Sequence, residues 1–259
     1  MKYLGGKYMI GKEISKIMLE LINPDSISGY LEPFCGALGV LKHMNKYYEN
    51  CEASDIHSDL IALWKSVQKG DFNPPEEVSE EDYLKIKEYK SPNALKAFVG
   101  FGLSFGGRYF AAYAPKYTNG KKEDYLQAAK NSMNKLHHLI QGVKFKNTSY
   151  LNLNPEKKVI YCDPPYQKTK FPIKYRTGTK DYDVFNNVEF WDVMRKWSKK
   201  NYVFISETTA PDDFVCIWEK KSHRSAAQST KTRYKNSSES YDSEKLFIHG
   251  SRFSELCEP

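Results

Sequence analysis

The sequence of 259 residues lacks long apolar runs. A membrane-spanning helix needs roughly 18 consecutive apolar residues, and every apolar run here is much shorter. Its first residues also lack an apolar secretory segment. Cysteine is scarce, and the five residues form no C-x-x-C pair, so neither a disulfide framework nor a zinc site is indicated. We therefore expect a cytoplasmic protein with no metal and no membrane partner.

Acidic residues are outnumbered, because 39 lysines and arginines against 32 aspartates and glutamates give a formal net charge of +7. A basic surface suits a polyanionic partner such as nucleic acid, although a basic chain can also be merely soluble. The length is enough for one domain with a sizeable insertion, and the sequence contains no internal repeat.

The most informative motif is Asp163-Pro164-Pro165-Tyr166, which follows the apolar run 159–162. That run has the length and β-branched content of a buried strand, so the motif falls at a strand end. The prolines have no N–H, and they hold the Asp163 carboxylate and the neighbouring carbonyls rigid with no local donor. Acceptors beside an aromatic ring suit the exocyclic amino group of a flat base that stacks on Tyr166. A Pro-Pro turn that leaves an edge strand is the plainer alternative.

The N-terminal segment Tyr3-Leu4-Gly5-Gly6-Lys7 precedes a run of apolar residues at helical spacing that ends before Pro24. Its glycine pair lets the backbone approach a ligand, Lys7 can meet a carboxylate or phosphate, and Tyr3 can stack on a base. A flexible arm fits the composition equally well.

A glycine turn follows the strand predicted to begin at Tyr30. Small residues at such a turn let backbone N–H groups approach a nucleotide, but Gly36 and Gly39 lack the spacing of a dinucleotide site. Asp55 ends the next predicted strand, where an acid typically accepts hydrogen bonds from ribose hydroxyls. The alternative for Asp55 is a surface aspartate at a strand end.

The composition changes at Gly70, and a charged helix over 76–89 begins a predicted insertion. Within this insertion, the stretch 104–117 mixes glycine turns, aromatic rings and cations. Arg108 can read a guanine edge, and a ring within 109–113 can wedge into a base step. The alternative is that most of these rings form the core of a small helical subdomain.

Three further basic stretches are candidates for ligand contact. The turn 118–122 suits phosphate, and 220–235 either contacts phosphates or is a solvated loop. The stretch 167–186 is long and poor in aliphatic residues, as in loops that close over active sites.

The second half of the chain predicts a helix over 188–199 followed by a buried strand over 202–206. With the strand before Asp163, these elements imply a right-handed parallel crossover. Apolar runs at 214–218 and 245–249 predict another buried strand and a last, short one.

Taken in order, these motifs resemble those of the DNA adenine methyltransferase (Dam-type) family, and the resemblance spans nearly the whole chain. The segments that carry it are Tyr3-Leu4-Gly5-Gly6-Lys7, Leu31-Glu32-Pro33-Phe34-Cys35-Gly36-Ala37, Asp55-Ile56-His57-Ser58-Asp59-Leu60-Ile61, Phe105-Gly106-Gly107-Arg108-Tyr109 and Tyr161-Cys162-Asp163-Pro164-Pro165-Tyr166. The resemblance implies an α/β fold, a Rossmann-like methyltransferase sheet with helices on both faces and a small, mainly helical target-recognition insertion. It divides the chain into a cofactor-binding half (1–69), the DNA recognition insertion (70–145) and a catalytic half (146–259).

The resemblance also implies the reaction, in which a methyl group passes from S-adenosyl-L-methionine to N-6 of a flipped adenine in double-stranded DNA, leaving S-adenosyl-L-homocysteine. The catalytic residues it implies are Asp163, Pro164, Pro165 and Tyr166. The cofactor-binding residues it implies are Tyr3, Gly5, Gly6, Lys7, Phe34, Cys35, Gly36, Asp55, Ile56 and Asp163. The DNA-binding residues it implies are Lys2, Arg108, Tyr109, Lys116, Lys121, Lys122 and Arg233. We expect a monomer or weak dimer on DNA, in bacterial or virus-infected host cytoplasm.

Two residues depart from the family pattern: Leu38 stands where a small residue is usual, and Glu207 follows Ser206 where relatives commonly have asparagine. The alternatives are methylation of a cytosine amino group or an RNA base, and a catalytically silent DNA-binding relative. The central interpretation requires that Asp163 is not buried against a lysine or arginine, and that side chains do not plug the glycine turn.

Overall fold

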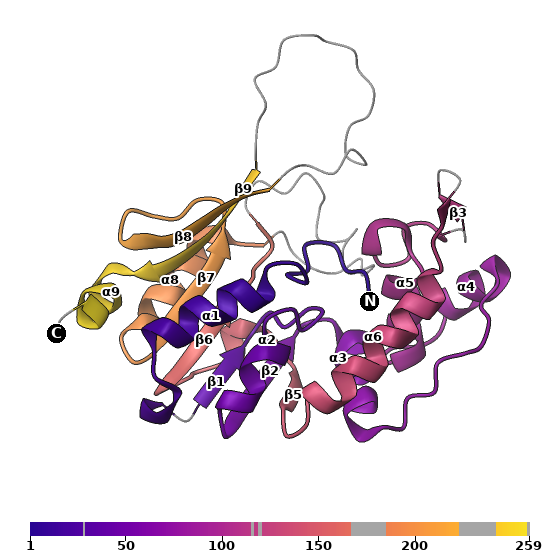
Figure 1. The fold of residues 1–259 in the computed structure, drawn as a ribbon, viewed down its shortest axis with the longest axis horizontal. Coiled ribbons are helices and arrows are strands. Elements are labelled where there is room, and N and C mark those ends of the chain that lie inside the picture. The colour runs from indigo at the N-terminus through magenta and orange to yellow at the C-terminus, as the bar shows by residue number, and fades with distance from the viewer. Residues whose placement is uncertain (28, 115–116, 119–120, 167–184, 223–241, 258–259) are drawn as a thin grey trace, which may run out of the picture.

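The computed structural model describes residues 1–27, 29–114, 117–118, 121–166, 185–222 and 242–257, which are organised around a seven-stranded sheet of order β5-β2-β1-β6-β7-β9-β8 (Figure 1). The strands of this sheet are β1 (Gly29–Glu32), β2 (Asn50–Asp55), β5 (Lys144–Asn147), β6 (Lys158–Cys162), β7 (Tyr202–Glu207), β8 (Phe214–Ser222) and β9 (Asp242–His249). The first five pair in parallel, whereas β9 is antiparallel to both β7 and β8. A separate short hairpin joins β3 (Tyr117–Thr118) to β4 (Lys121–Lys122).

Helices cover both faces of the sheet. They are α1 (Gly11–Leu21), α2 (Leu41–Met44), α3 (Ser58–Lys69), α4 (Glu80–Lys87), α5 (Ala94–Gly102), α6 (Tyr125–Leu139), α8 (Asn187–Ser198) and α9 (Gly250–Cys257). Short 3₁₀ turns occur at Pro24–Ser26, Asn45–Tyr47, Phe105–Gly107 and Tyr150–Asn152.

The alternation of side chains along each strand divides the core into two clusters, because successive residues of a strand point to opposite faces. Tyr161 of β6 packs in the cluster that contains α1, α2 and α3, whereas Ile160 and Cys162 pack in the cluster on α8. The α8 cluster includes the aromatic side chains Phe190 and Trp197. The predicted Rossmann-like methyltransferase sheet with helices on both faces is confirmed, as is the parallel crossover from β6 through α8 to β7.

The strand order places a topological switch between β1 and β6. From β1 the chain continues to β2 and β5 on one side, and from β6 it continues to β7 on the other. Ligands of open α/β sheets bind outside the carboxyl ends of the strands at such a point. The glycine turn after β1 and the Asp163 motif after β6 therefore meet at the edge where a site is expected.

Two strands differ from the sequence prediction. Strand β5 was not predicted, because only Phe145 of its four residues is buried, and so it carries no apolar run. The run 214–218 was predicted as a buried strand, but β8 is a longer strand at the edge of the sheet, and only Phe214 among those five residues is buried. Edge strands carry weak apolar signals because one side lacks a partner strand.

Helices α4, α5 and α6 lie beside the sheet on the side of β2 and β5 (Figure 1). Their buried side chains, such as Phe98 and Met133, belong to the same cluster as Trp64 of α3. The residues of the predicted insertion therefore share a core with the sheet domain. No helix among the described residues is long and apolar enough to cross a membrane.

A glycine in the middle of the sheet makes room for a lysine that crosses a strand. A Cβ on Gly29 of β1 would lie 2.9 Å from Cγ of Lys158 on β6. The Lys158 ammonium passes over that position and lies 2.7 Å from Oε1 of Glu52 on β2, while Lys146 on β5 lies 2.9 Å from Oε2. Glu52 thus links the side chains of β2, β5 and β6 on one face of the sheet.

Candidate active site

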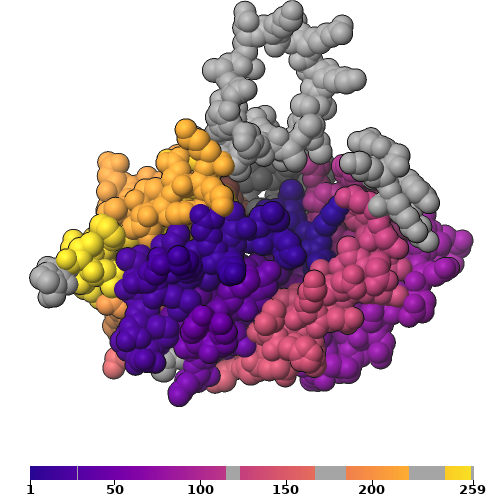
Figure 2. All heavy atoms as spheres, viewed as in Figure 1, coloured from indigo at the N-terminus to yellow at the C-terminus, as the bar shows by residue number. Residues whose placement is uncertain are grey.

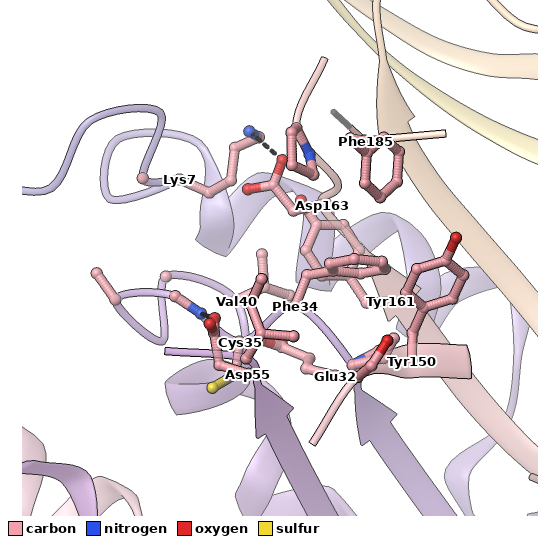
Figure 3. A pocket seen from close by; sticks show the side chains of 18 of the residues that line it. Lys7, Glu32, Phe34, Cys35, Val40, Asp55, Tyr150, Tyr161, Asp163 and Phe185 are labelled. Carbon is pink, nitrogen blue, oxygen red and sulfur yellow. Dashed lines mark hydrogen bonds and ion pairs between the residues drawn. The ribbon is translucent and has the colours of Figure 1, made fainter. Parts of the chain in front are cut away.

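A cavity of about 540 Å³ opens at the carboxyl ends of β1, β2 and β6 (Figure 3). Every residue predicted to bind the cofactor lines this cavity except Gly5. Of the predicted catalytic residues, Asp163 and Pro165 line it, whereas Pro164 is buried and Tyr166 is half-buried outside this lining. The volume is in the ordinary range for a site that holds a small molecule.

The glycine turn is shaped by Asp55, whose two carboxylate oxygens both accept backbone hydrogen bonds. Oδ2 accepts from Gly36 N at 3.0 Å, and Oδ1 accepts from His57 N at 2.9 Å. The Gly36 carbonyl accepts in turn from Trp64 Nε1 at 2.9 Å. Gly36 has φ of 43°, a left-handed conformation that glycine adopts without strain. The turn is therefore held open beside an acid that still lines the cavity.

Leu38 does not plug the turn. Its side chain is fully buried in the core below the turn and is not part of the cavity wall. Its backbone has φ of 59°, which is unfavourable for a residue with a Cβ. Leu38, which departs from the family pattern, therefore strains the backbone of the turn but does not block the cavity.

One wall of the cavity is aromatic. The Phe34 ring lies 5.1 Å from the Tyr150 ring and 6.1 Å from the Phe185 ring, measured between centroids. Phe34 was predicted, whereas Tyr150 and Phe185 were missed because neither lies in a recognisable motif. Flat apolar surfaces of this kind suit a planar ring or a sulfonium cation.

A buried acid closes the floor of the cavity. Glu32 is 2% exposed and accepts a hydrogen bond from the Tyr30 hydroxyl at 2.6 Å. Burial raises the pKa of Glu32 well above its usual value, although the hydrogen bond from Tyr30 opposes this shift. Burial also raises the pKa of the neighbouring Cys35 thiol, so Cys35 is a poor nucleophile.

The Lys7 ammonium lies against two acids near the end of β6. Its Nζ donates to Asp163 Oδ1 at 2.7 Å (Figure 3) and lies 2.9 Å from Oε1 of Glu244 on β9. The same Nζ lies 4.8 Å from the centroid of the Tyr166 ring, and the Tyr166 hydroxyl donates to Glu244 Oε1 at 2.6 Å. We call Lys7, Asp163, Tyr166 and Glu244 the lysine cluster.

The lysine cluster corrects the predicted environment of Asp163. The sequence analysis required that this acid is not buried against a cation, but Lys7 lies directly against it. The Asp163 side chain nevertheless is 20% exposed and lines the cavity, so it is paired without being sealed off. The donor to Asp163 comes from the distant N-terminal segment and not from the motif itself, and Lys7 meets a carboxylate, as its residue type suggested.

Lys7 keeps its charge in this environment although only 6% of it is exposed. Burial lowers the pKa of Lys7, but the carboxylates of Asp163 and Glu244 outweigh that effect and raise it overall. Burial raises the pKa of Tyr166 well above its usual range, and the neighbouring Asp163 and Glu244 reinforce the shift. The cluster therefore consists of one ammonium, two carboxyl groups and a protonated phenol.

The N-terminal segment is held in place on both sides. A Cβ on Gly36 would lie 3.2 Å from Cε1 of Tyr3, and one on Gly107 would lie 2.5 Å from Tyr3 N. Leu4 N donates to the Gly107 carbonyl at 3.1 Å. Figure 2 shows this segment, in indigo, between the orange and yellow C-terminal part and the pink and magenta helices. The flexible-arm alternative is therefore not what the structure shows.

The predicted DNA-binding residues lie in different surroundings. Lys2 is half-exposed and pairs with Glu123 at 3.1 Å, and Arg108 is half-buried. Lys121 and Lys122 form β4, while Lys116 and Arg233 lie outside the described residues. Residues 167–184 of the closing loop predicted over 167–186, and residues 223–235 of the segment predicted to contact phosphates, also lie outside them.

Tyr109 requires a correction. It is 6% exposed, and its hydroxyl donates to Oδ2 of buried Asp59 at 2.6 Å. Its burial argues against the direct DNA contact that was predicted, and Phe110 is equally buried. The aromatic ring that this turn exposes is Phe105, which is 46% exposed. The sequence did not distinguish Phe105 from its aromatic neighbours, because the fold decides which side chains of such a stretch are exposed.

Among the described residues, no group of three or more histidine, cysteine, aspartate or glutamate side chains is placed to hold a metal ion. The sheet order, with the cavity at its switch point between the glycine turn and the Asp163 motif, defines a Rossmann-like α/β fold.

Comparison with known proteins gives a more particular assignment. Residues 3–97 match the family model of the D12 class N6 adenine-specific DNA methyltransferase. The chain is also 29% identical over 189 residues to the type II methyltransferase M.CviBI of Paramecium bursaria Chlorella virus NC1A, which covers 62% of this chain and 68% of that protein. These matches confirm the resemblance to DNA adenine methyltransferases.

A solved structure also aligns with the chain. It is the rRNA methyltransferase aviRa from Streptomyces viridochromogenes, with a TM-score of 0.42, 10% identity and coverage of 96% of this chain and 87% of that one.

Proposed function

We propose that the protein transfers a methyl group from S-adenosyl-L-methionine to N-6 of an adenine extruded from double-stranded DNA. The observation that carries this proposal is the position of Asp163 at the end of β6, on the wall of the cavity that the glycine turn and Asp55 also line. The match of residues 3–97 to the adenine-specific family supports the choice of base.

The residues of the cavity fit S-adenosyl-L-methionine. Asp55 suits ribose hydroxyls, and Phe34 with Tyr150 suits a flat ring or a sulfonium. The buried acid Glu32 suits a ligand that brings a positive group, because a cation nearby would favour its charged form. When bound, S-adenosyl-L-methionine supplies an electrophilic methyl group on a sulfonium sulfur.

The chain's own part in the transfer is to hold the base and its amino protons. Asp163 and the Pro164 carbonyl accept hydrogen bonds from the amino group, which favours the pyramidal geometry in which its lone pair points outward. Tyr166 supplies a ring face for stacking. Extruding the base costs a few kcal/mol, which these contacts offset.

The recognition of DNA belongs, in this proposal, to the insertion over 70–145. Phe105 is exposed on the turn Phe105–Gly107, and Gly107 packs against Tyr3 of the cavity wall. In this proposal, the exposed ring fills the gap left by an extruded base. We therefore assign the wedge to Phe105 in place of Tyr109, with Arg108 beside it.

The test is methyl transfer from S-adenosyl-L-methionine carrying a labelled methyl group, with double-stranded DNA, single-stranded DNA and RNA as separate substrates. Nucleoside analysis of the product is expected to show N6-methyladenine in the duplex. Labelled N4-methylcytosine or labelled RNA would support the alternatives, and absence of transfer with intact duplex binding would indicate a silent DNA-binding relative.

A further inference from the structure

We propose that Glu244 is a positioning residue of the transfer site, which shares the Lys7 ammonium with Asp163 and fixes the ring of Tyr166. This inference rests on the proposed methyl transfer and adds a residue far from every motif in the sequence. Glu244 lies on β9, which forms an antiparallel pair with β8. It does not line the cavity.

The geometry gives Glu244 two contacts through one oxygen. Oε1 lies 2.9 Å from Lys7 Nζ and accepts the Tyr166 hydroxyl at 2.6 Å. The side chains are well enclosed, with 5% exposure for Lys7 and 19% for Glu244. Charged hydrogen bonds in such an enclosed place are short and directional, so they restrict both partners.

The charge balance explains why a second acid is needed. If Asp163 were the one anion beside the enclosed Lys7 ammonium, Lys7 would hold that carboxylate tightly. The ammonium would then compete with the amino group of the base for the oxygens of Asp163. Glu244 gives Lys7 another anion, and the three groups together carry a net charge of −1 when ionised. Lys7 can then remain on Glu244 while Asp163 turns its acceptor toward the base, because the ammonium does not lose its counter-charge.

The contact with Tyr166 has a separate effect. A tyrosine side chain rotates about two bonds, and a hydrogen bond at its far end restricts rotation about the first of them, which holds the ring in its position. A base that stacks on Tyr166 is held in line with the methyl donor only if the ring stays in that position, and a displacement of about 1 Å can cost roughly 100-fold in rate. Glu244 thus controls orientation without touching the substrate.

The test compares Glu244→Gln with Glu219→Gln, a control on the adjacent strand β8 whose acid lies exposed beside Lys245. Glutamine keeps an acceptor for the Tyr166 hydroxyl but removes the charge. We expect kcat of Glu244→Gln to fall by roughly 10- to 100-fold, with unchanged affinity for S-adenosyl-L-homocysteine measured by calorimetry. Glu244→Asp should recover part of the rate because it restores the charge.

The pH profile distinguishes positioning from a merely structural role. Lys7 faces the carboxyls of Asp163 and Glu244 and the ring of Tyr166, while Tyr166 also faces Tyr161. Removing one carboxylate lowers the pKa of Lys7, so the alkaline limb of kcat should move to lower pH in Glu244→Gln and stay in place in Glu219→Gln.

The outcomes separate the two proposals. If the wild type methylates adenine and Glu244→Gln has a normal kcat and pH profile, the role of Glu244 is overturned and the proposed function stands. A wild-type protein without transfer to duplex DNA overturns the proposed function itself. If Glu244→Gln does not fold, Tyr166→Phe removes the same hydroxyl contact, and a normal kcat for that variant would overturn the orienting role.

Discussion

At the end of β6, Asp163 meets a lysine that the chain brings from its N-terminal segment. The ion pair keeps the carboxylate in place beside the cavity, where the proposed function needs an acceptor for the amino group of a base. Substituting Asp163 should therefore affect the chemical step more than DNA binding.

For Asp163→Asn we expect kcat to fall by roughly 100-fold or more, because the amide lacks the charge and replaces one acceptor by a donor. Affinity for duplex DNA, measured by fluorescence anisotropy, should change little. Asp192→Asn is the matched control, since that acid is exposed on α8 and pairs with Arg195 at 2.8 Å. Methyl transfer by Asp163→Asn at near the normal rate would remove Asp163 from the mechanism.

The strained backbone of Leu38 predicts an unusual order of stabilities. Glycine normally destabilises relative to alanine, but at φ of 59° it avoids the clash that the Cβ of alanine makes. Both variants lose the buried side chain, at a cost of about 2–5 kcal/mol. Leu38→Gly should be more stable than Leu38→Ala by about 1 kcal/mol in urea unfolding. The reverse order would show that the left-handed backbone is not maintained.

The sequence identified the residues of the site whose chemistry is local. Asp163 with its prolines, Gly36 and Asp55 all lie at strand ends, where residue type and position suffice to predict a role. Glu244 could not be predicted in this way, because its contacts with Lys7 and Tyr166 depend on how β9 pairs with β7. Tyr109 was assigned wrongly because an aromatic residue beside an arginine gives no indication of burial.

Among the elements, the strands β2, β5 and β6 are linked by Glu52, and this link depends on pH. Burial alone would raise the pKa of Glu52, but the hydrogen bonds and charges of Lys158 and Lys146 lower it to about 2. A depressed pKa stabilises the fold fully above the ordinary value near 4.5 and loses that effect as the pH falls toward 2.

Glu52→Gln should therefore lower the free energy of unfolding by about 1–2 kcal/mol at neutral pH, because water screens part of the interaction with half-exposed Lys146, and the difference from wild type should vanish as the pH approaches 2. Urea unfolding at several pH values provides the measurement. Glu20→Gln, an exposed acid with an i,i+4 lysine partner, is the control. A difference that stays constant with pH would contradict the ion-pair explanation.

The turn Phe105–Gly107 gives a prediction about DNA. Phe105→Ala removes the exposed ring, so base extrusion loses its wedge, and we expect weaker transfer at low DNA concentration with a KM for duplex raised about tenfold. A duplex with a mismatch at the target should recover part of the loss, because its base is already unstacked. Tyr47→Ala, which removes an exposed aromatic ring on the turn Asn45–Tyr47 away from the cavity, is the control.

The elements that the sequence predicted best are those with strong periodicity. The core strands 159–162 and 202–206 and the helix 188–199 match β6, β7 and α8 closely. Strand β5 was missed because a four-residue edge strand with one buried side chain has no period to detect. The helix over 76–89 was predicted too long, because its charged ends lie outside α4.

Across the whole molecule, the N-terminal segment joins the helical side to the cavity. Gly107 contacts Tyr3, and Tyr3 lines the cavity and packs on Phe101 of α5 with ring centroids 4.9 Å apart. A change on the helical side can therefore reach the cavity, which is the proposed cofactor site, without touching it.

Two adjacent glycines test this connection. Gly106 and Gly107 both have left-handed backbones, with φ of 69° and 66°, but a Cβ on Gly106 meets nothing within 4 Å whereas one on Gly107 meets Tyr3 N at 2.5 Å. Gly107→Ala should weaken S-adenosyl-L-homocysteine binding about tenfold in calorimetry without DNA, and Gly106→Ala should not. Equal affinities for the two variants would show that the segment does not transmit the change.

The missing side chain at Gly29 also constrains how this sequence can change over time. An alanine there is obstructed while Lys158 crosses the strand, so the substitution becomes acceptable only after position 158 has acquired a shorter side chain. The two positions are thus expected to mutate in a fixed order. A library that randomises both together should recover larger residues at 29 only in company with small ones at 158.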